Sequence, residues 1–173
     1  TVDAPKLRGR VERERVAPTG AVMKWKVSDP FAETALESSI EISSSHKEDL
    51  GWTVLKSEPT GLANLSRVSV LSRETNTVFA RVTVVSDHAQ SKTLAFGYSD
   101  RLRLFFNDRL LYTGNNGYRT RDYRYLGTIG YFDAITLPLE EGRNELWFAV
   151  SESFGGWGVQ AAFEDTDGLT FVY

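Results

Sequence analysis

Cysteine is absent from this sequence, and its only histidines are His46 and His88. A chain without cysteine forms no disulfide and offers neither a thiol nucleophile nor a thiolate metal ligand. Both histidines lie in polar, loop-like stretches, where an ordinary surface position is a simpler interpretation than a catalytic one. The lack of cysteine leaves the cellular compartment open, and we favour a secreted or periplasmic location.

Long hydrophobic runs are also missing. No apolar stretch approaches the roughly 20 residues that a membrane-spanning helix needs, so we expect no membrane span. The sequence lacks the Gly-x-Ser-x-Gly elbow, the phosphate-binding loop, the His-Glu-x-x-His zinc motif and the Gly-x-Gly-x-x-Gly dinucleotide motif. With 173 residues, 41% of them hydrophobic, the chain can still build a substantial core. It begins at Thr1 without methionine, so we expect a processed or excised chain.

Charge is unevenly distributed along a chain whose net charge is only −3. Residues 101–124 contain six arginines and two aspartates, whereas residues 133–167 contain eight acidic residues and one arginine. Blocks of opposite charge usually pair across a fold. We therefore interpret the basic block as internally compensated and expect no nucleic-acid partner.

Alternation of apolar and polar residues predicts β-strands along most of the chain. The clearest candidates are residues 21–27, 51–56, 76–87, 92–98, 101–107, 131–137, 144–150 and 157–164. Many short strands at spacings of about ten residues predict an all-β fold, an antiparallel β-sandwich of the jelly-roll type with at most one or two short helices.

Punctuating residues divide the chain. Residues 1–20 contain few apolar residues and are interrupted by the turn formers Pro5, Gly9, Pro18 and Gly20. This composition predicts an N-terminal arm before a single domain over residues 21–173. Ser28-Asp29-Pro30 predicts the start of a short helix, and residues 43–49 read as an exposed loop. A long loop is expected over residues 113–130.

Three segments resemble the galactose-binding-like jelly-roll superfamily. Residues 101–112 (RLRLFFNDRLLY) resemble its strand–turn–strand unit, and residues 137–150 (LPLEEGRNELWFAV) its leucine, glycine, asparagine and alternating-strand signature. Residues 154–163 (FGGWGVQAAF) resemble its last core strand. The chain departs from the pattern at Asp108, where the superfamily turn usually has glycine, and in the long charged loop at residues 114–130.

The resemblance implies both a fold and a class of ligand. The superfamily includes carbohydrate-binding modules and the sugar-binding domains of large glycosidases, so a carbohydrate partner is implied. Jelly rolls of this kind often carry a structural calcium ion, for which Asp165 and Asp167 near the C-terminus are the candidate ligands. A solvated acidic turn is the simpler interpretation of the same residues.

The loop between Tyr112 and Tyr131 holds the richest surface chemistry. Its candidate ligand-binding residues are Asn116, Tyr118, Arg119, Arg121, Asp122 and Tyr123. Tyrosine rings stack on the C–H faces of sugars, and the planar groups of arginine, aspartate and asparagine match sugar hydroxyls. The same residues could equally form an internal ion network that pins a long loop, and the sequence leaves both interpretations open.

Trp157 is surrounded by Gly155, Gly156 and Gly158. It is a further ligand-binding candidate as a stacking platform at the rim of the sandwich. We favour the alternative, a core tryptophan that needs small neighbours to fit.

Three functions remain open, and we place a non-catalytic carbohydrate-binding module first. The second is a structural or protein-interaction domain of a larger polypeptide or assembly, with the charged arm lying along a protein partner. The third is a small polysaccharide-active enzyme that uses a carboxylate pair. The candidate carboxylates are Asp100, Asp122, Asp133 and Glu152.

Overall fold

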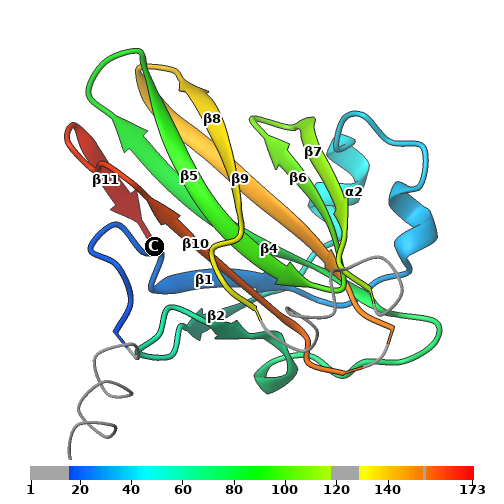
Figure 1. Cartoon of the computed structure of the whole chain (residues 1–173). Helices are drawn as coiled ribbons and strands as arrows, with labels where there is room; N and C mark the ends of the chain where they lie inside the picture. The colour runs from blue at the N-terminus through cyan, green and yellow to red at the C-terminus, as the bar shows by residue number, and fades with distance from the viewer. Residues whose placement is uncertain (1–15, 118–128, 154) are drawn as a thin grey trace, which may run out of the picture.

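In the computed structural model, which describes residues 16–117, 129–153 and 155–173, two antiparallel β-sheets pack face to face (Figure 1). The elements are β1 (Lys24–Ser28), η1 (Glu33–Leu36), α2 (Ser44–Glu48), β2 (Trp52–Lys56), β3 (Ala63–Asn64), η2 (Leu65–Arg67), β4 (Thr77–Ser86), β5 (Gln90–Ser99), β6 (Arg101–Phe106), β7 (Arg109–Asn115), β8 (Asp133–Leu139), β9 (Gly142–Ser151), β10 (Gly158–Phe163) and β11 (Leu169–Val172). Among the described residues no helix is long and apolar enough to cross a membrane.

The larger sheet has the strand order β2-β1-β4-β9-β6-β7, with β11 paired to β4, and the smaller sheet has the order β3-β10-β5-β8. From β2 onward every successive strand lies in the other sheet, with the one exception of the β6–β7 hairpin, which stays in the larger sheet. All described pairings are antiparallel. The all-β antiparallel sandwich expected from the sequence is confirmed, and its helical segments are three to five residues long.

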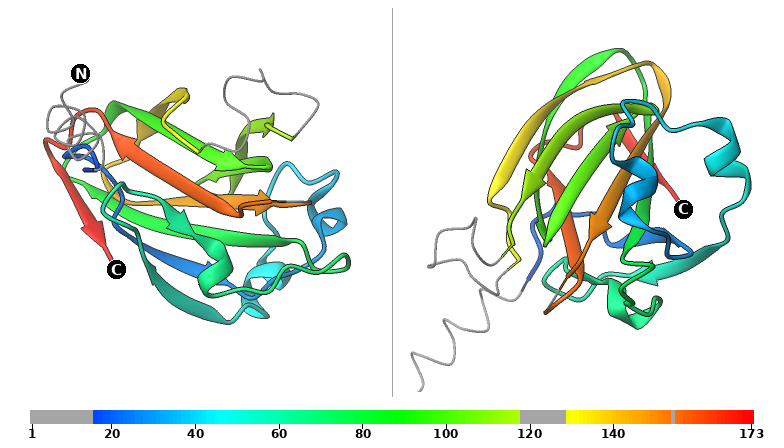
Figure 2. Two further views of the ribbon diagram at one scale, coloured as in Figure 1. Left: turned by 60° about the horizontal axis from the view of Figure 1, so that its bottom comes forward. Right: turned by 90° about the vertical axis from the view of Figure 1, so that its right-hand side faces the viewer.

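The main core lies between the two sheets. Because side chains alternate across a strand, one face of β4 contributes Val78, Ala80, Val82 and Val84 to this core. The opposite face of the large sheet, which we call the outer face, carries a second apolar cluster around Phe79, Phe105 and Trp147. Figure 2 shows the cyan segment, with η1 and α2, lying beside the large sheet.

The covering segment packs Leu36 and Ile42 onto that outer cluster. The sequence predicted its helices only in part. The short helix forms as η1, but it begins at Glu33 after Ala32, and the Asp29 carboxylate instead accepts a hydrogen bond from the Gly51 N–H at 3.1 Å. The prediction of an exposed loop at residues 43–49 was wrong, because the Ser43 hydroxyl accepts from the His46 N–H and caps α2.

One buried asparagine joins two turns of the sandwich. The β6–β7 hairpin turns through Asn107 and Asp108 alone, both at positive φ (46° and 73°), as a two-residue turn requires. Asn144 is fully buried, and its Oδ1 accepts from the Glu140 N–H at 2.9 Å and from the Asn107 side-chain amide at 3.2 Å. Its own amide donates to the carbonyls of Glu140 and Gly142. Asn144 therefore fixes the β8–β9 turn against the β6–β7 turn.

We expect Asn144→Ala to lower the free energy of unfolding by about 2–3 kcal/mol, because it leaves buried donors and acceptors without partners. The measurement is urea denaturation followed by tryptophan fluorescence. Asn64→Ala is the control: it removes one N-cap acceptor from the Ser66 N–H, worth about 1 kcal/mol. Equal losses in the two variants would contradict the role given to Asn144.

Candidate functional site

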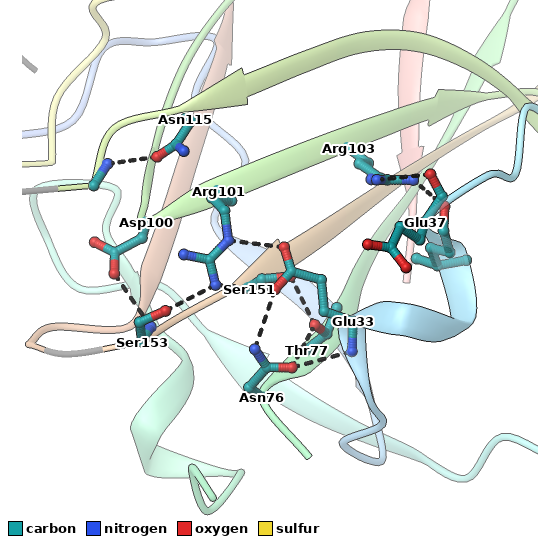
Figure 3. A network of polar contacts seen from close by, with 12 residues as sticks. Glu33, Glu37, Asn76, Thr77, Asp100, Arg101, Arg103, Asn115, Ser151 and Ser153 are labelled. Carbon is teal, nitrogen blue, oxygen red and sulfur yellow. Dashed lines mark hydrogen bonds and ion pairs between the residues drawn. The ribbon is translucent and has the colours of Figure 1, made fainter. Parts of the chain in front are cut away.

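An open polar cleft lies on the outer face of the large sheet, where β6, β7 and β9 meet η1 (Figure 3). Its volume is about 410 Å³. We call it the edge cleft, and its polar lining residues are Glu33, Arg101, Arg103, Thr113, Asn115 and Ser151. These side chains come from four separate elements, so only the tertiary fold brings them together.

The alternation of β6 explains why two arginines reach the cleft. In this strand Leu102 and Leu104 are buried in the core, so Arg101 and Arg103 lie on the outer face. On neighbouring β7, Thr113 and Asn115 are exposed, again two residues apart. The edge cleft is therefore lined by the polar faces of two strands whose opposite faces are fixed by packing.

A two-pronged ion pair forms the wall between β6 and η1. Arg101 donates from Nε to Glu33 Oε1 at 2.7 Å and from Nη2 to Glu33 Oε2 at 2.9 Å. Asn76 holds the same glutamate from its other side: its amide donates to Oε2 at 3.2 Å and its Oδ1 accepts from the Glu33 N–H at 3.1 Å. Arg101 Nη2 also donates to the Ser153 hydroxyl at 2.9 Å. Figure 3 shows these contacts as one connected network.

The electrostatics of this pair favour the charged forms. Hydrogen bonds from Arg101 hold the pKa of Glu33 below its ordinary value, against a smaller opposing effect of burial. The same hydrogen bonds raise the pKa of Arg101, to which the charges of Asp100 and Glu152 also contribute. The pair stays ionised at neutral pH and presents a fixed, planar array of donors and acceptors.

The other arginine of the cleft, Arg103, acts as a clamp on the covering segment. Its guanidinium donates to the carbonyls of Leu36 and Glu37, the latter at 3.1 Å. These carbonyls end η1, and a cation at this position satisfies acceptors that the short helix leaves open. Arg103 therefore positions η1 over β6.

A glycine is required on the floor of the cleft. A Cβ at Gly114 would overlap the hydroxyl oxygens of Tyr98 and Tyr112, which lie 3.0 Å apart and hydrogen-bond each other. Burial raises the pKa of Tyr112. Gly114 therefore lets β7 lie close to this tyrosine pair on its core side, while Thr113 lies on the cleft side.

The sequence predicted a loop over residues 113–130, but residues 113–115 are the end of β7, so the loop begins only after Asn115. Tyr118, Arg119, Arg121, Asp122 and Tyr123 lie outside the described residues. Asn116 is described and half-buried.

The two residues that begin the loop are held by β6 and β7. The Asn116 N–H donates to the Asp100 carbonyl at 2.6 Å, and the Gly117 N–H donates to Asn115 Oδ1 at 2.8 Å. The predicted loop therefore starts directly beside the edge cleft.

Trp157 lies in the core and not at the surface. It is 2% exposed, and its indole N–H donates to the Val150 carbonyl at 3.1 Å. This burial leaves no ring face open for a sugar, so the core interpretation describes Trp157 and the stacking platform does not. The glycine that follows it is also required for packing, since a Cβ at Gly158 would press on the side chains of Ile129 and Leu62 and on the Ala63 carbonyl.

The acidic turn proposed for calcium is engaged within the protein. Asp165 Oδ2 accepts from Lys92 Nζ at 2.7 Å, and its Oδ1 accepts from the Asp167 N–H at 2.9 Å. The hydrogen bond from Lys92 lowers the pKa of Asp165. In the described part of the chain no group of three or more His, Cys, Asp or Glu side chains is placed to hold a metal ion. Calcium binding at Asp165 and Asp167 stays a prediction.

The candidate carboxylates and histidines are scattered. Asp100 and Glu152 both lie close enough to Arg101 to affect its pKa, whereas Asp133 begins β8 in the small sheet and Asp122 lies outside the described residues. His88 is exposed and contacts its neighbour Asp87.

His46 packs edge-on against Phe31 at 4.9 Å and Phe79 at 5.5 Å. Burial lowers its pKa. His46 thus has a packing role at the outer cluster, away from the edge cleft.

Sequence reasoning missed the central pair of the site. Glu33 was read only as part of a short helix, and Arg101 only as part of a basic block. The alternation in residues 101–106 carries the available signal, since it places Arg101 and Arg103 together on one face of a strand. The partner of Arg101 lies 68 residues away, and no local pattern marks it.

No family model matches the chain, and no curated protein matches its sequence. Solved structures with a similar fold include a family 35 carbohydrate binding module from an environmental isolate, 14% identical, with a TM-score of 0.39 over 56% of this chain and 72% of that one. A β-glucosidase from Kluyveromyces marxianus is 14% identical, with a TM-score of 0.48 over 82% of this chain. The same enzyme in complex with glucose is 15% identical, with a TM-score of 0.46 over 86% of this chain. The matched part is 16% of the β-glucosidase chain.

We expect Glu33→Gln to lower the free energy of unfolding by about 1 kcal/mol at pH 7, because the pair is partly buried and two-pronged. The folded-state pKa of Glu33 is lowered, so its contribution is fully present above the ordinary glutamate pKa and disappears as the pH falls through the folded value. The difference between wild type and variant should therefore shrink below about pH 5. Denaturant titrations from pH 7 to pH 3 measure this difference in the free energy of unfolding.

The matched control is Glu37→Gln in the same short segment, where the side chain is exposed. It should stay within about 0.5 kcal/mol of wild type. A Glu33→Gln effect that is the same at pH 3 and pH 7 would mean that the charge of Glu33 is not what stabilises the wall.

Proposed function

We propose that this protein is a non-catalytic carbohydrate-binding module and that the edge cleft is part of its ligand site. One observation supports this most directly: an open cleft of about 410 Å³ is lined by planar and hydroxylic groups on strands whose other faces are packed in the core. Sugar hydroxyls both donate and accept, and they are best matched by carboxylate, guanidinium, amide and hydroxyl groups held in fixed positions.

Each side chain has a distinct part in this proposal. The Glu33–Arg101 pair offers an acceptor and a donor side by side, already ordered by Asn76 and Ser153 before any ligand arrives. Groups that are ordered in advance lose little entropy on binding. Thr113 lies on the opposite side of the cleft and adds an exposed hydroxyl.

The predicted loop completes the proposed site. Its residues Tyr118, Arg119, Arg121, Asp122 and Tyr123 follow directly after Gly117, at the end of the strand that lines the cleft. In the proposal a tyrosine of this loop stacks on a sugar face, and the cleft binds the hydroxyls on the ring edge. Asn116 lies between the strand and the loop, and its backbone N–H is bonded to the Asp100 carbonyl.

We expect the isolated protein to bind a defined set of glycans on a glycan array, and Thr113→Val to weaken that binding about tenfold. Thr113→Val keeps the shape of the side chain and removes one hydrogen-bonding group, worth about 1–1.5 kcal/mol. Thr53→Val on β2, also exposed, is the matched control and should bind as wild type does. Arrays with and without calcium test the predicted metal dependence in the same experiment.

Three outcomes would contradict the proposal. A blank array from folded protein would favour a protein-interaction domain, and a pull-down would follow. New reducing ends released from a polysaccharide panel would favour an enzyme. Unchanged affinity in Thr113→Val and in Tyr123→Ala would place the carbohydrate site elsewhere.

A further inference from the structure

A second groove on the outer face of the large sheet is lined by positive charge. It lies over β1, β2, β4, β9 and β11 and has a volume of about 200 Å³. We call it the basic groove, and its charged lining residues are Lys24, Lys26, Arg81 and Arg143. No acidic side chain is among the described residues that line it. In Figure 1 β1 and β2 lie at the bottom of the sandwich, whereas β6 and β7 lie at its upper right, and β9 runs between the two sites and lines a part of each.

The strand register places like charges directly opposite one another. Within β1, Trp25 and Val27 are buried in the core, so Lys24 and Lys26 lie on the outer face. Lys24 is the cross-strand partner of Lys56, and Lys26 is the partner of Arg81. Like charges in directly opposed positions destabilise a sheet. Two such pairs therefore meet on adjoining strands.

Little negative charge compensates these cations. Glu145 accepts from Arg143 Nε at 3.1 Å, lies 4.0 Å from Arg81 Nε and also accepts from the Thr83 hydroxyl. One carboxylate thus serves two arginines. In the described part of the chain no acidic side chain forms an ion pair with Lys24 or Lys26.

This concentration of charge does not follow from the overall composition. The chain has a net charge of −3, with 23 acidic residues available to neutralise 20 lysines and arginines. Elsewhere on the outer face the cations are paired: Arg101 with Glu33, Arg109 with Glu41, and Lys47 with Asp108. A destabilising, unneutralised cluster on a rigid sheet is the arrangement that a polyanion would stabilise.

We propose that the basic groove binds an acidic polysaccharide, a chain of uronate sugars whose carboxylates meet Lys24, Lys26, Arg81 and Arg143. The charges supply the attraction, and the exposed side chains of Val54 and Val172 beside them supply apolar surface for the C–H faces of the rings. This site is separate from the edge cleft and shares no lining residue with it. The two proposals can therefore be tested independently.

The groove suits a polysaccharide better than an acidic peptide. It lies on the face of a sheet, where the N–H and C=O groups of β1 already pair with β2 and β4. A peptide laid across this face would leave its own backbone groups without protein partners. A polysaccharide has no amide backbone, and its hydroxyls can keep water as their partner on this open face.

The groove also suits a polysaccharide better than a nucleic acid. Single-stranded nucleic acids are held by aromatic rings on which bases stack. The exposed ring here, Tyr173, is stacked on Phe171 with a centroid separation of 6.4 Å, and Lys24 Nζ lies over it at 5.3 Å. Among the described residues that line the groove Tyr173 is the one exposed ring, since Trp25 is buried, and a single ring cannot stack successive bases, so recognition depends on charge and aliphatic surface.

The test compares polygalacturonate with its methyl-esterified form, which has the same sugar chain without the charge. We expect wild type to bind polygalacturonate at low salt by affinity electrophoresis or calorimetry, to lose at least about tenfold in affinity when the salt is raised to 0.5 M, and not to bind the esterified chain. Lys24→Glu and Lys26→Glu should each weaken binding about tenfold or more. Lys26→Gln serves as a milder variant that keeps the fold.

A stability readout distinguishes this inference from a merely basic surface. Since Lys26 faces Arg81, Lys26→Glu replaces a like-charge pair with an opposite-charge pair, so its melting temperature should equal or exceed that of wild type while its binding is lost. Arg67→Glu, an exposed charge reversal in η2, is the control and should bind as wild type does.

Several results would overturn the inference. They are equal binding of the esterified chain, unchanged binding in Lys24→Glu and Lys26→Glu, or equally tight binding of single-stranded DNA or poly-glutamate. Thr113→Val separates this inference from the proposed function. If Thr113→Val still binds polygalacturonate, the basic groove is supported even where the glycan array is blank. If Thr113→Val loses this binding and Lys26→Glu keeps it, the inference of a basic groove is overturned.

Discussion

The pairing of β4 with β9 is the constraint on which both surface sites depend. Ten residue pairs run from Thr77 opposite Ser151 to Ser86 opposite Gly142, through the centre of the large sheet. Since side chains alternate with a period of two, a slip of one residue would turn the valines of β4 outward and Arg81 into the core. The burial of one face therefore fixes what the other face presents, and polar residues there are held as firmly as the core itself.

Positive charge on the outer face has partners at one end of the sheet and lacks them at the other. At the β6 end, each arginine has a partner: Glu33 for Arg101 and the η1 carbonyls for Arg103. At the β1 end, Lys24 and Lys26 face other cations. Arginines that are neutralised by a partner rigidify a surface. Clustered lysines without a partner repel one another, and an anionic ligand can relieve that repulsion. The two ends of one sheet thus differ in kind, although their strands carry the same alternation.

Period-two alternation made the sandwich predictable, since it is a local property of residues such as those of β4 and β9. The charge blocks were less informative. The basic block was expected to pair with the acidic stretch after residue 133, but among the described residues Arg101 and Arg109 pair with Glu33 and Glu41. Such pairings depend on where a non-repetitive segment folds back over the sheet, and neither propensity nor spacing encodes that path.

The same limit explains the errors in the covering segment and the groups beside the predicted ligand loop that the sequence did not reveal. Ser28-Asp29-Pro30 carries a helix-start signal, yet Asp29 binds the Gly51 N–H because the segment has to leave β1 and return to β2. Tertiary contacts there outweighed a local preference worth about 1 kcal/mol. At the loop, composition predicted ligand-binding residues just after β7, whereas the ordered groups beside it, Glu33 and Arg101, become visible only in three dimensions.

The covering segment links the edge cleft to the stability of the fold. It closes the outer apolar cluster through Leu36 and Ile42, and it is pinned by backbone hydrogen bonds between Ile42 and Asp108 and between Leu110 and Ile40. It also supplies Glu33 to the cleft. A ligand that binds Glu33 and Arg101 together would therefore favour the closed position of this segment over any opened one. Binding at the cleft and burial of the cluster are then thermodynamically coupled, because one short helix serves both.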